Sequence, residues 1–92
     1  MVLYRIYTED RNRGDVIDTV HSYFHGFTTY NGVGYWRGQA ESCLVIEILG
    51  EASTDAEADV MAIAEWIRRH NAQESVAITK QEVEVETVGE QI

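Results

Sequence analysis

The chain has 92 residues, of which 45% are hydrophobic and 25% are charged, and its formal net charge is −9 at pH 7. This length and composition suit one globular domain, 1–92. The single cysteine excludes an intrachain disulfide and a zinc site built on cysteine pairs, and the negative charge argues against nucleic acid or an anionic membrane as a direct partner. We find no apolar run long enough for a membrane span and no leader segment, so we expect a cytoplasmic protein in a reducing compartment.

The first quarter of the chain predicts a strand and then a helix. Met1–Thr8 is largely apolar on both alternating faces, which is typical of an interior strand. Glu9–Gly14 is a polar connection. Asp15–His25 places apolar residues at helical spacing, and Gly26 is a suitable stop for the helix.

The middle of the chain predicts strands. Phe27–Tyr30 is a short strand rich in residues that favour sheets. Asn31–Gly38 contains three glycines and is open to two interpretations, a bent strand or an irregular hairpin arm. Ser42–Leu49 is the most apolar run in the chain, so we expect it to be a central strand.

A second helix is the clearest element in the sequence. We expect Thr54 to cap its start, with Glu57 three residues later completing a capping box. Asn71 is a suitable left-handed cap at its end. The stripe expected to be buried comprises Ala56, Val60, Ile63, Ala64 and Ile67.

The end of the chain predicts one strand and leaves a second open. Ser75–Thr79 is expected to be a strand. Gln81–Val88 alternates acidic and apolar residues, and it either extends that strand or forms a separate edge strand. The chain contains no proline that could interrupt pairing at a sheet edge.

The order of elements is β-α-β-β-α-β, which is the split βαβ arrangement of ferredoxin-like domains. We therefore expect an α+β fold with a four-stranded antiparallel sheet and two helices on one face. That topology places the first and third strands at the centre of the sheet, and these are the two most apolar strands here.

The usual catalytic and metal-binding patterns are weak. His21 and His25 lie four residues apart on the first predicted helix, but no further ligand has a suitable spacing, so we expect no metal or cofactor. Cys43 is expected to be a small core residue, because a position within a sheet does not lower a thiol pKa. Glu47 interrupts an apolar strand and is expected on the uncovered sheet face. An acid–base role for it remains open, but no nucleophile or second carboxylate supports one, so we predict no catalytic residues and no enzyme.

A glycine-rich stretch contains the first candidate binding residues. Tyr35, Trp36 and Arg37 lie among three glycines, without the strand–turn–helix context of a phosphate loop. These residue types are enriched in binding hot spots. The stretch either packs over the end of the sheet or binds a protein or a flat ligand.

Acidic residues form the second candidate set. Residues 1–46 carry four basic and five acidic side chains, whereas residues 47–92 carry three basic and eleven acidic ones. On a strand, Glu82, Glu84 and Glu86 would lie on one face about 6.6–6.8 Å apart, a spacing similar to that of phosphates in a nucleic-acid strand. A second acidic line would form if the second helix began early enough to include Glu51 with Asp55 and Asp59. These carboxylates either mimic a polyanion or form a solvated surface.

The βαββαβ pattern resembles small regulators of the nitrogen-regulatory PII type and the divalent-ion-tolerance CutA type. That resemblance implies an oligomeric small-molecule sensor or sponge, with residues 35–37 lining a site at a subunit boundary. The chain lacks the long ligand loop and the phosphate-facing lysines of those regulators.

In size, acidity and missing catalytic motifs, the chain also resembles phage-encoded inhibitors such as anti-CRISPR proteins. That resemblance implies a binding protein that occupies a basic, nucleic-acid-binding surface of a protein partner. We take this as the first hypothesis and expect a monomer or homodimer rather than a larger ring. The residues expected to contact the partner are Glu82, Glu84, Glu86, Trp36, Arg37, Tyr35, Asp55 and Asp59. The sensor is the alternative.

Overall fold

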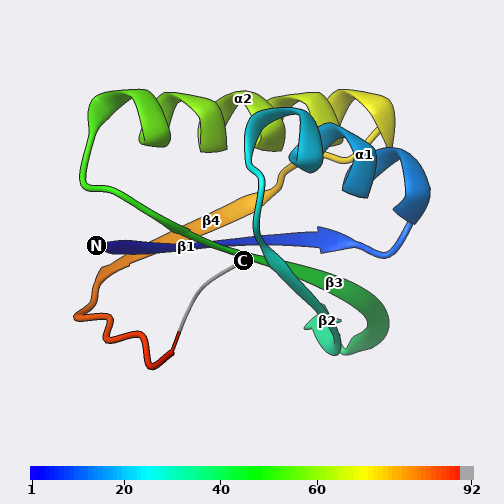
Figure 1. Ribbon diagram of the computed structural model, residues 1–92. Coiled ribbons are helices and arrows are strands. Elements are labelled where there is room, and N and C mark those ends of the chain that lie inside the picture. The colour runs from blue at the N-terminus through cyan, green and yellow to red at the C-terminus, as the bar shows by residue number, and fades with distance from the viewer. Residues whose placement is uncertain (90–92) are drawn as a thin grey trace.

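The computed structural model describes residues 1–89 and shows a sheet covered on one face by two helices (Figure 1). The elements are β1 (Val2–Glu9), α1 (Arg13–Tyr23), β2 (Thr28–Trp36), β3 (Gln39–Gly50), α2 (Thr54–His70) and β4 (Ala77–Glu82). The strand order is β2-β3-β1-β4, and every neighbouring pair is antiparallel. The predicted α+β, ferredoxin-like fold is confirmed, with β1 and β3 at the centre of the sheet.

Strict alternation in the central strands builds the core. In β1 the even-numbered residues are buried and the odd-numbered residues are half-buried. Even-numbered residues of β3 pair with them, as Ile6 does with Ile46, so both strands present their apolar sides to the helices. The most completely buried side chains are Ile6, Leu44, Ile46, Ile48, Ile63, Ile67, Val16, Val20 and Val60.

The ends of α1 differ from the sequence prediction. The helix begins at Arg13 and ends at Tyr23, two residues earlier than expected at each end. Phe24 is already extended, with φ −131°, and its side chain packs against the core. The helix ends before Gly26 because Phe24 leaves it to pack against the core. Gly26 is therefore not the residue that stops the helix.

The caps of α2 also differ from the prediction. Ser53 is the N-cap, because its hydroxyl accepts the backbone N–H of Ala56 at 3.2 Å, and Thr54 is the first helical residue. The predicted cap is therefore wrong by one residue, and no capping box forms, because the third helical residue is Ala56 and not a glutamate. At the other end Asn71 has φ −93°, and Ala72 is the left-handed residue, with φ 52°.

Asn71 is buried because its side chain connects the end of α2 to the residues that precede α1. Its amide nitrogen donates to the Arg11 carbonyl at 3.1 Å, and its Oδ1 accepts from Asn12 at 2.8 Å. This side chain thus holds the end of α2 against the connection that precedes α1, which is a tertiary role that the local pattern did not indicate.

β2 and β3 form one long hairpin, so residues 31–36 belong to a hairpin arm, but the arm is regular and continuous with the strand predicted at 27–30. The turn residues Arg37 and Gly38 have φ 49° and 79°. Two successive left-handed residues are typical of a type I′ turn, whose twist matches that of the strands. Pairing of β1 with β3 ends at Glu9 and Cys43, so the outer part of the hairpin projects beyond the rest of the sheet.

β4 begins later than the sequence predicted, and it ends before the predicted region does. It begins at Ala77 and ends at Glu82, so Ser75 and Val76 lie outside it. One further backbone hydrogen bond joins the Val83 N–H to the Met1 carbonyl at 3.0 Å. Residues 83–88 lie outside any strand, so only residues 81 and 82 of the predicted region 81–88 continue β4, and no separate edge strand forms there.

The sheet face opposite the helices carries an ion pair among apolar side chains. Arg5 Nε lies 3.0 Å from Glu47 Oε2, and the Tyr30 hydroxyl lies 3.2 Å from the same oxygen. The hydrogen bond with Glu47 raises the pKa of Arg5. The predicted position of Glu47 on this open face is correct, and its carboxylate is occupied by partners from its own chain.

Within residues 1–89, none of the helices combines the length and apolar character that crossing a membrane requires.

Candidate functional site

The structure places the candidate residues in three separate regions. Tyr35, Trp36 and Arg37 lie at the tip of the β2–β3 hairpin. Asp55 and Asp59 lie on α2. Glu82 ends β4, and the segment with Glu84 and Glu86 that follows lies on the other side of the sheet from the helices (Figure 1). The two acidic sets therefore do not form one continuous surface.

Neither acidic line has the predicted regular spacing. Glu51 precedes α2, so it does not continue the helical line of Asp55 and Asp59, and Asp59 is half-buried. Glu82 is the last residue of β4, whereas Glu84 and Glu86 lie beyond it, outside any strand. All three glutamates are exposed, and a strand does not hold them on one face.

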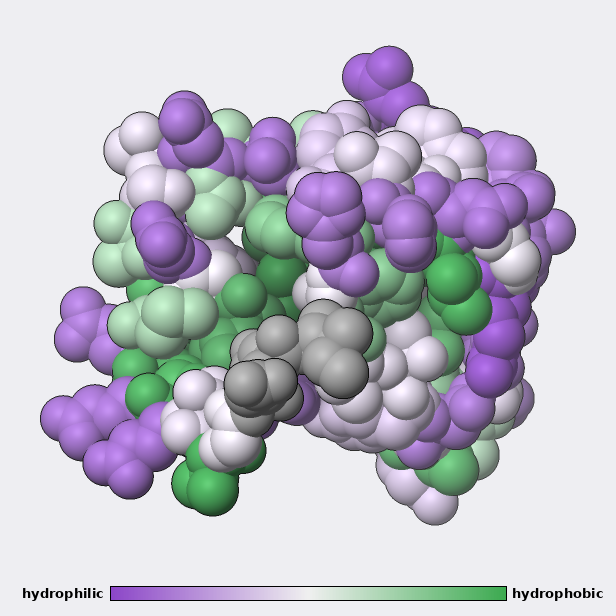
Figure 2. All heavy atoms as spheres, viewed as in Figure 1, coloured by the Kyte–Doolittle hydropathy of each residue, from purple (hydrophilic) through white to green (hydrophobic). Residues whose placement is uncertain are grey.

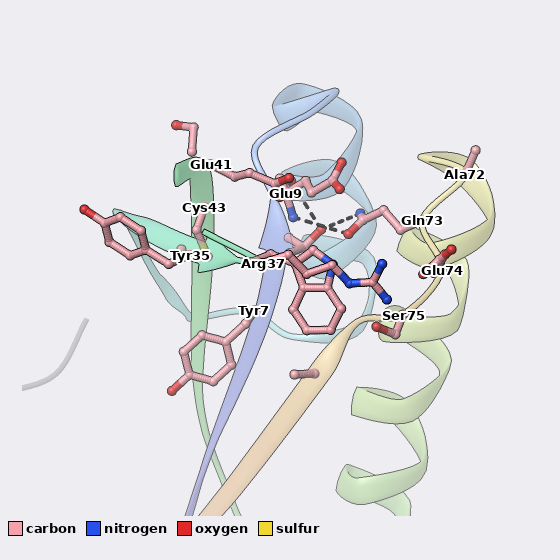
Figure 3. Close-up of a pocket in the computed structure, with 15 residues that line it drawn as sticks. Tyr7, Glu9, Tyr35, Arg37, Glu41, Cys43, Ala72, Gln73, Glu74 and Ser75 are labelled. Atoms are coloured by element: carbon pink, nitrogen blue, oxygen red, sulfur yellow. Dashed lines mark hydrogen bonds between the residues drawn. The ribbon is translucent and has the colours of Figure 1, made fainter. Parts of the chain in front are cut away.

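A cavity of about 690 Å³ lies between the hairpin tip and the connection from α2 to β4. The lining comes from three parts of the chain: the end of β1, the two arms of the hairpin tip, and residues 72–75. The projection of the hairpin beyond β1 creates this space, because the tip has no strand beside it. Figure 3 shows the side chains that surround it.

Gln73 builds one wall of this cavity. Its amide nitrogen donates to the Thr8 hydroxyl at 2.7 Å, and its carbonyl oxygen accepts the Glu9 backbone N–H at 3.3 Å (Figure 3). Gln73 and Thr8 are both buried. These bonds fix the α2–β4 connection to the end of β1, so the wall is a rigid part of the fold.

Trp36 and Arg37 form the opposite wall. The Trp36 side chain is 63% exposed, although tryptophan is usually well buried. The Arg37 guanidinium lies 5.6 Å from the centre of the indole ring, within cation–π range. Figure 3 shows Arg37 extending toward Glu74 and Ser75 across the cavity, while Tyr35 points away from it. Tyr35 and Trp36 are both exposed, which does not fit the alternative that they pack over the sheet end. That these residues bind a protein or a flat ligand stays a prediction.

Arg37 differs from the other basic side chains in its electrostatic surroundings. Across residues 1–89, it is the one lysine or arginine for which the structure shows no carboxylate within ion-pair distance. The other pairs are Arg5–Glu47, Arg11–Glu9, Arg13–Asp10, Arg68–Glu65, Arg69–Glu65 and Lys80–Glu57. In a chain with a net charge of −9, an unpaired guanidinium beside a cavity is a group available to a ligand or partner.

Cys43 lies on the cavity wall and is half-buried, so the prediction that it belongs to the core is wrong. Burial raises the pKa of its thiol, with a smaller contribution in the same direction from Asp10. A thiol with a raised pKa is a poor nucleophile at neutral pH. Its position therefore adds a small uncharged surface to the cavity rather than a reactive group.

His21 lies on α1, and its ring meets Phe27 edge-on at 6.5 Å. His25 lies beyond the end of α1. In the described part of the chain, no three histidine, cysteine or acidic side chains gather as a metal site would require.

The sequence did not indicate the α2–β4 connection as part of the site. Gln73, Glu74 and Ser75 are ordinary polar residues after a helix, and no spacing relates them to residues 35–37. Only the folded hairpin brings the two segments to the same cavity.

No protein-family model matches the chain, and no curated protein matches it. Solved structures do match. A DUF3240 family protein from Shewanella baltica superposes with a TM-score of 0.76 at 19% identity, covering 96% of each chain. A phage SAM lyase in its apo state superposes with a TM-score of 0.69 at 21% identity, covering 87% of this chain and 78% of the other.

A phage SAM lyase in complex with S-methyl-5'-thioadenosine also matches, with a TM-score of 0.61 at 23% identity, covering 88% of this chain and 80% of the other. At these identities the likeness concerns the fold, and it agrees with the ferredoxin-like arrangement described above.

Proposed function

We propose that this protein binds a small molecule of the adenosine type without catalysing a reaction. The ligand lies in the cavity between the hairpin tip and the α2–β4 connection. The observation that carries the proposal is the exposed Trp36–Arg37 pair at the wall of a cavity of ligand size. This proposal is related to the sensor or sponge that was the alternative from the sequence, but it places the site within one chain and not at a subunit boundary.

The size and the aromatic wall suit a nucleoside. The cavity volume of about 690 Å³ lies in the range of ordinary small-molecule sites. The exposed indole of Trp36 offers a flat surface on which a purine can stack, and such stacking contributes about 1–3 kcal/mol per base.

Polar groups around the indole suit the rest of such a ligand. Arg37 supplies donors, and the unpaired carboxylates of Glu41 and Glu74 supply acceptors for ribose hydroxyls or an exocyclic amino group. Ser75 supplies a hydroxyl that can do either. A few directed polar groups beside an aromatic surface are typical of ligand sites.

A related fold supplies a precedent for the ligand class. One of the phage SAM lyase structures that resemble this chain is a complex with S-methyl-5'-thioadenosine. Since that neighbour is an enzyme, the fold is compatible with catalysis. We base the proposed absence of catalysis on the groups in the cavity: the Cys43 thiol has a raised pKa, and the Gln73 amide is engaged by Thr8 and Glu9. We further propose a cytoplasmic location, from the single free thiol.

Isothermal titration with S-methyl-5'-thioadenosine tests the binding, with Trp36→Ala as the decisive variant. We expect the wild type to bind and W36A to lose affinity by roughly fivefold to 150-fold, the equivalent of one stacked base. Tyr23→Ala is the matched control, because Tyr23 is an exposed aromatic residue on α1 outside the cavity lining. Y23A should bind like the wild type.

A wild type that binds neither S-methyl-5'-thioadenosine nor adenosine nor S-adenosylmethionine would contradict the proposal. Equal losses of affinity in W36A and Y23A would contradict the placement of the ligand beside Trp36. Incubation with S-adenosylmethionine followed by chromatography tests the absence of catalysis, which predicts that the compound is recovered unchanged.

The acidic-partner hypothesis is a second candidate. It is favoured by the net charge of −9 and by three exposed glutamates, one at the end of β4 and two just beyond it. Under this proposal Glu82, Glu84 and Glu86 contact a basic, nucleic-acid-binding protein surface, as a phage anti-CRISPR-like inhibitor would. The broken spacing of these carboxylates supports a general electrostatic contact rather than a nucleic-acid mimic in register. Asp55 and Asp59 lie on the other side of the sheet and belong to a separate surface.

A triple variant tests this second candidate. Changing Glu82, Glu84 and Glu86 to glutamine should weaken capture on a basic resin such as immobilised polylysine and flatten the salt dependence of elution. Asp55→Asn with Asp59→Asn is the control that removes charge from the other surface. Identical salt dependence in the wild type and the triple variant would contradict a role for these three residues.

A further inference from the structure

We propose that residues 83–88 of one copy of this chain pair as a β-strand along the outer edge of β2 in a second copy. This inference is independent of the proposed ligand. It concerns a segment that has the pattern of a strand but no strand to pair with in its own chain.

The pattern of the segment is that of a strand with one apolar side. Val83, Val85 and Thr87 alternate with Glu84 and Glu86. Such alternation over several residues is the signature of a half-buried strand. The structure instead leaves residues 83–88 outside any strand, with Val85 42% exposed and Val88 99% exposed.

The pairing of β4 with β1 ends just before this segment. The first residue of β1 pairs with Glu82, and the last backbone bond runs from the Val83 N–H to the Met1 carbonyl. Beyond that bond the described part of the chain offers the segment no neighbouring strand. The space-filling view shows hydrophobic residues exposed on the part of the viewed face that lies below the helices (Figure 2).

β2 offers an open edge of suitable length. It has nine residues, and the strand order places it at the side of the sheet with only β3 as a neighbour. Its outer backbone groups form a row of unpaired donors and acceptors, which is a template for another strand. The strand contains no proline and no charged residue to discourage pairing.

Charge favours β2 over the other edge of the sheet. Residues 83–88 carry two carboxylates, whereas β2 carries none and is followed by the unpaired guanidinium of Arg37. β4, the other edge strand, has only six residues and ends in Glu82. An acidic strand is therefore better matched to the edge of β2, because opposite charges across an interface attract and like charges oppose pairing.

The segment and the β2 edge are different surfaces, so one contact leaves the β2 edge of the first copy and the segment of the second copy free. Reciprocal exchange between two copies uses both and forms a homodimer, one of the two states expected from the sequence. Repetition in one direction instead gives a ring or an open chain of copies. A mass measurement distinguishes these two arrangements, and either one contains the proposed contact.

Light scattering coupled to gel filtration, over a range of concentrations of the full chain, tests the proposal. We expect a mass above the 10.5 kDa of one chain for the wild type. Val85→Pro removes a backbone N–H from the segment and should shift the population toward the single-chain mass. Val85→Thr keeps the N–H and the branched shape, and it should retain the association.

A matched pair of substitutions tests the edge of β2. Val33 is 63% exposed and lies outside the cavity lining. Val33→Glu places a negative charge opposite the acidic segment and should weaken association, whereas Val33→Lys should preserve or strengthen it. A wild type at the mass of one chain throughout, or an assembly that V85P and V33E leave unchanged, would overturn the proposal. Circular dichroism spectra that match the wild type show that the variants fold.

Discussion

Replacing Ile46 with alanine is expected to lower the free energy of unfolding by about 2–5 kcal/mol. Ile46 is fully buried in the middle of β3 and pairs with Ile6 of β1, and both belong to the core beneath the helices. The truncation removes apolar contacts and leaves a cavity that the central strands cannot close. Urea unfolding followed by circular dichroism measures the loss.

Leu49→Ala is the control for this prediction. Leu49 lies in the same strand but is 41% exposed, on the face of the sheet that the helices do not cover. We expect a much smaller change in the free energy of unfolding, because less apolar surface leaves the water when the chain folds. A loss in L49A as large as that in I46A would contradict the assignment of the core to one face of the sheet.

Replacing Gln73 with leucine is expected to cost about 1–3 kcal/mol of unfolding free energy. The side chain is buried, and its removal leaves the Glu9 N–H without its partner. The same substitution should weaken ligand binding, because it releases the wall of the cavity from the end of β1. Urea unfolding and isothermal titration with S-methyl-5'-thioadenosine measure the two effects.

Gln81→Leu is the matched control for this prediction, since Gln81 is an exposed residue of β4 that does not line the cavity. Q81L should leave both stability and binding close to the wild type. A Q73L variant that unfolds and binds like the wild type would show that the two hydrogen bonds do not support the site.

The fold was predictable because the hydrophobic pattern is consistent along the chain. Two strongly apolar strands, two helices and the order of elements suffice to indicate a ferredoxin-like sheet and its central strands. The ends of the elements were less predictable, because tertiary contacts decide them. Phe24 leaves α1 early to reach the core, and Asn71 bonds to the connection before α1 instead of adopting a left-handed cap.

The candidate site was only half predictable. Residue type and glycine spacing drew attention to Trp36 and Arg37, and the structure places both at a cavity. The opposite wall comes from Gln73 and its neighbours, which no local pattern connects to the hairpin. The acidic residues illustrate the reverse case: alternation predicted a strand over 81–88, but the pairing with β1 ends at Glu82.

The proposed binding site is tested most directly by nuclear magnetic resonance on the uniformly ¹⁵N-labelled chain, titrated with S-methyl-5'-thioadenosine. The account predicts shifts of the Trp36 indole N–H and of the backbone amides of Arg37, Glu74 and Ser75, which lie on both walls of the cavity. Spectra that do not change, or shifts confined to residues 82–86, would contradict it.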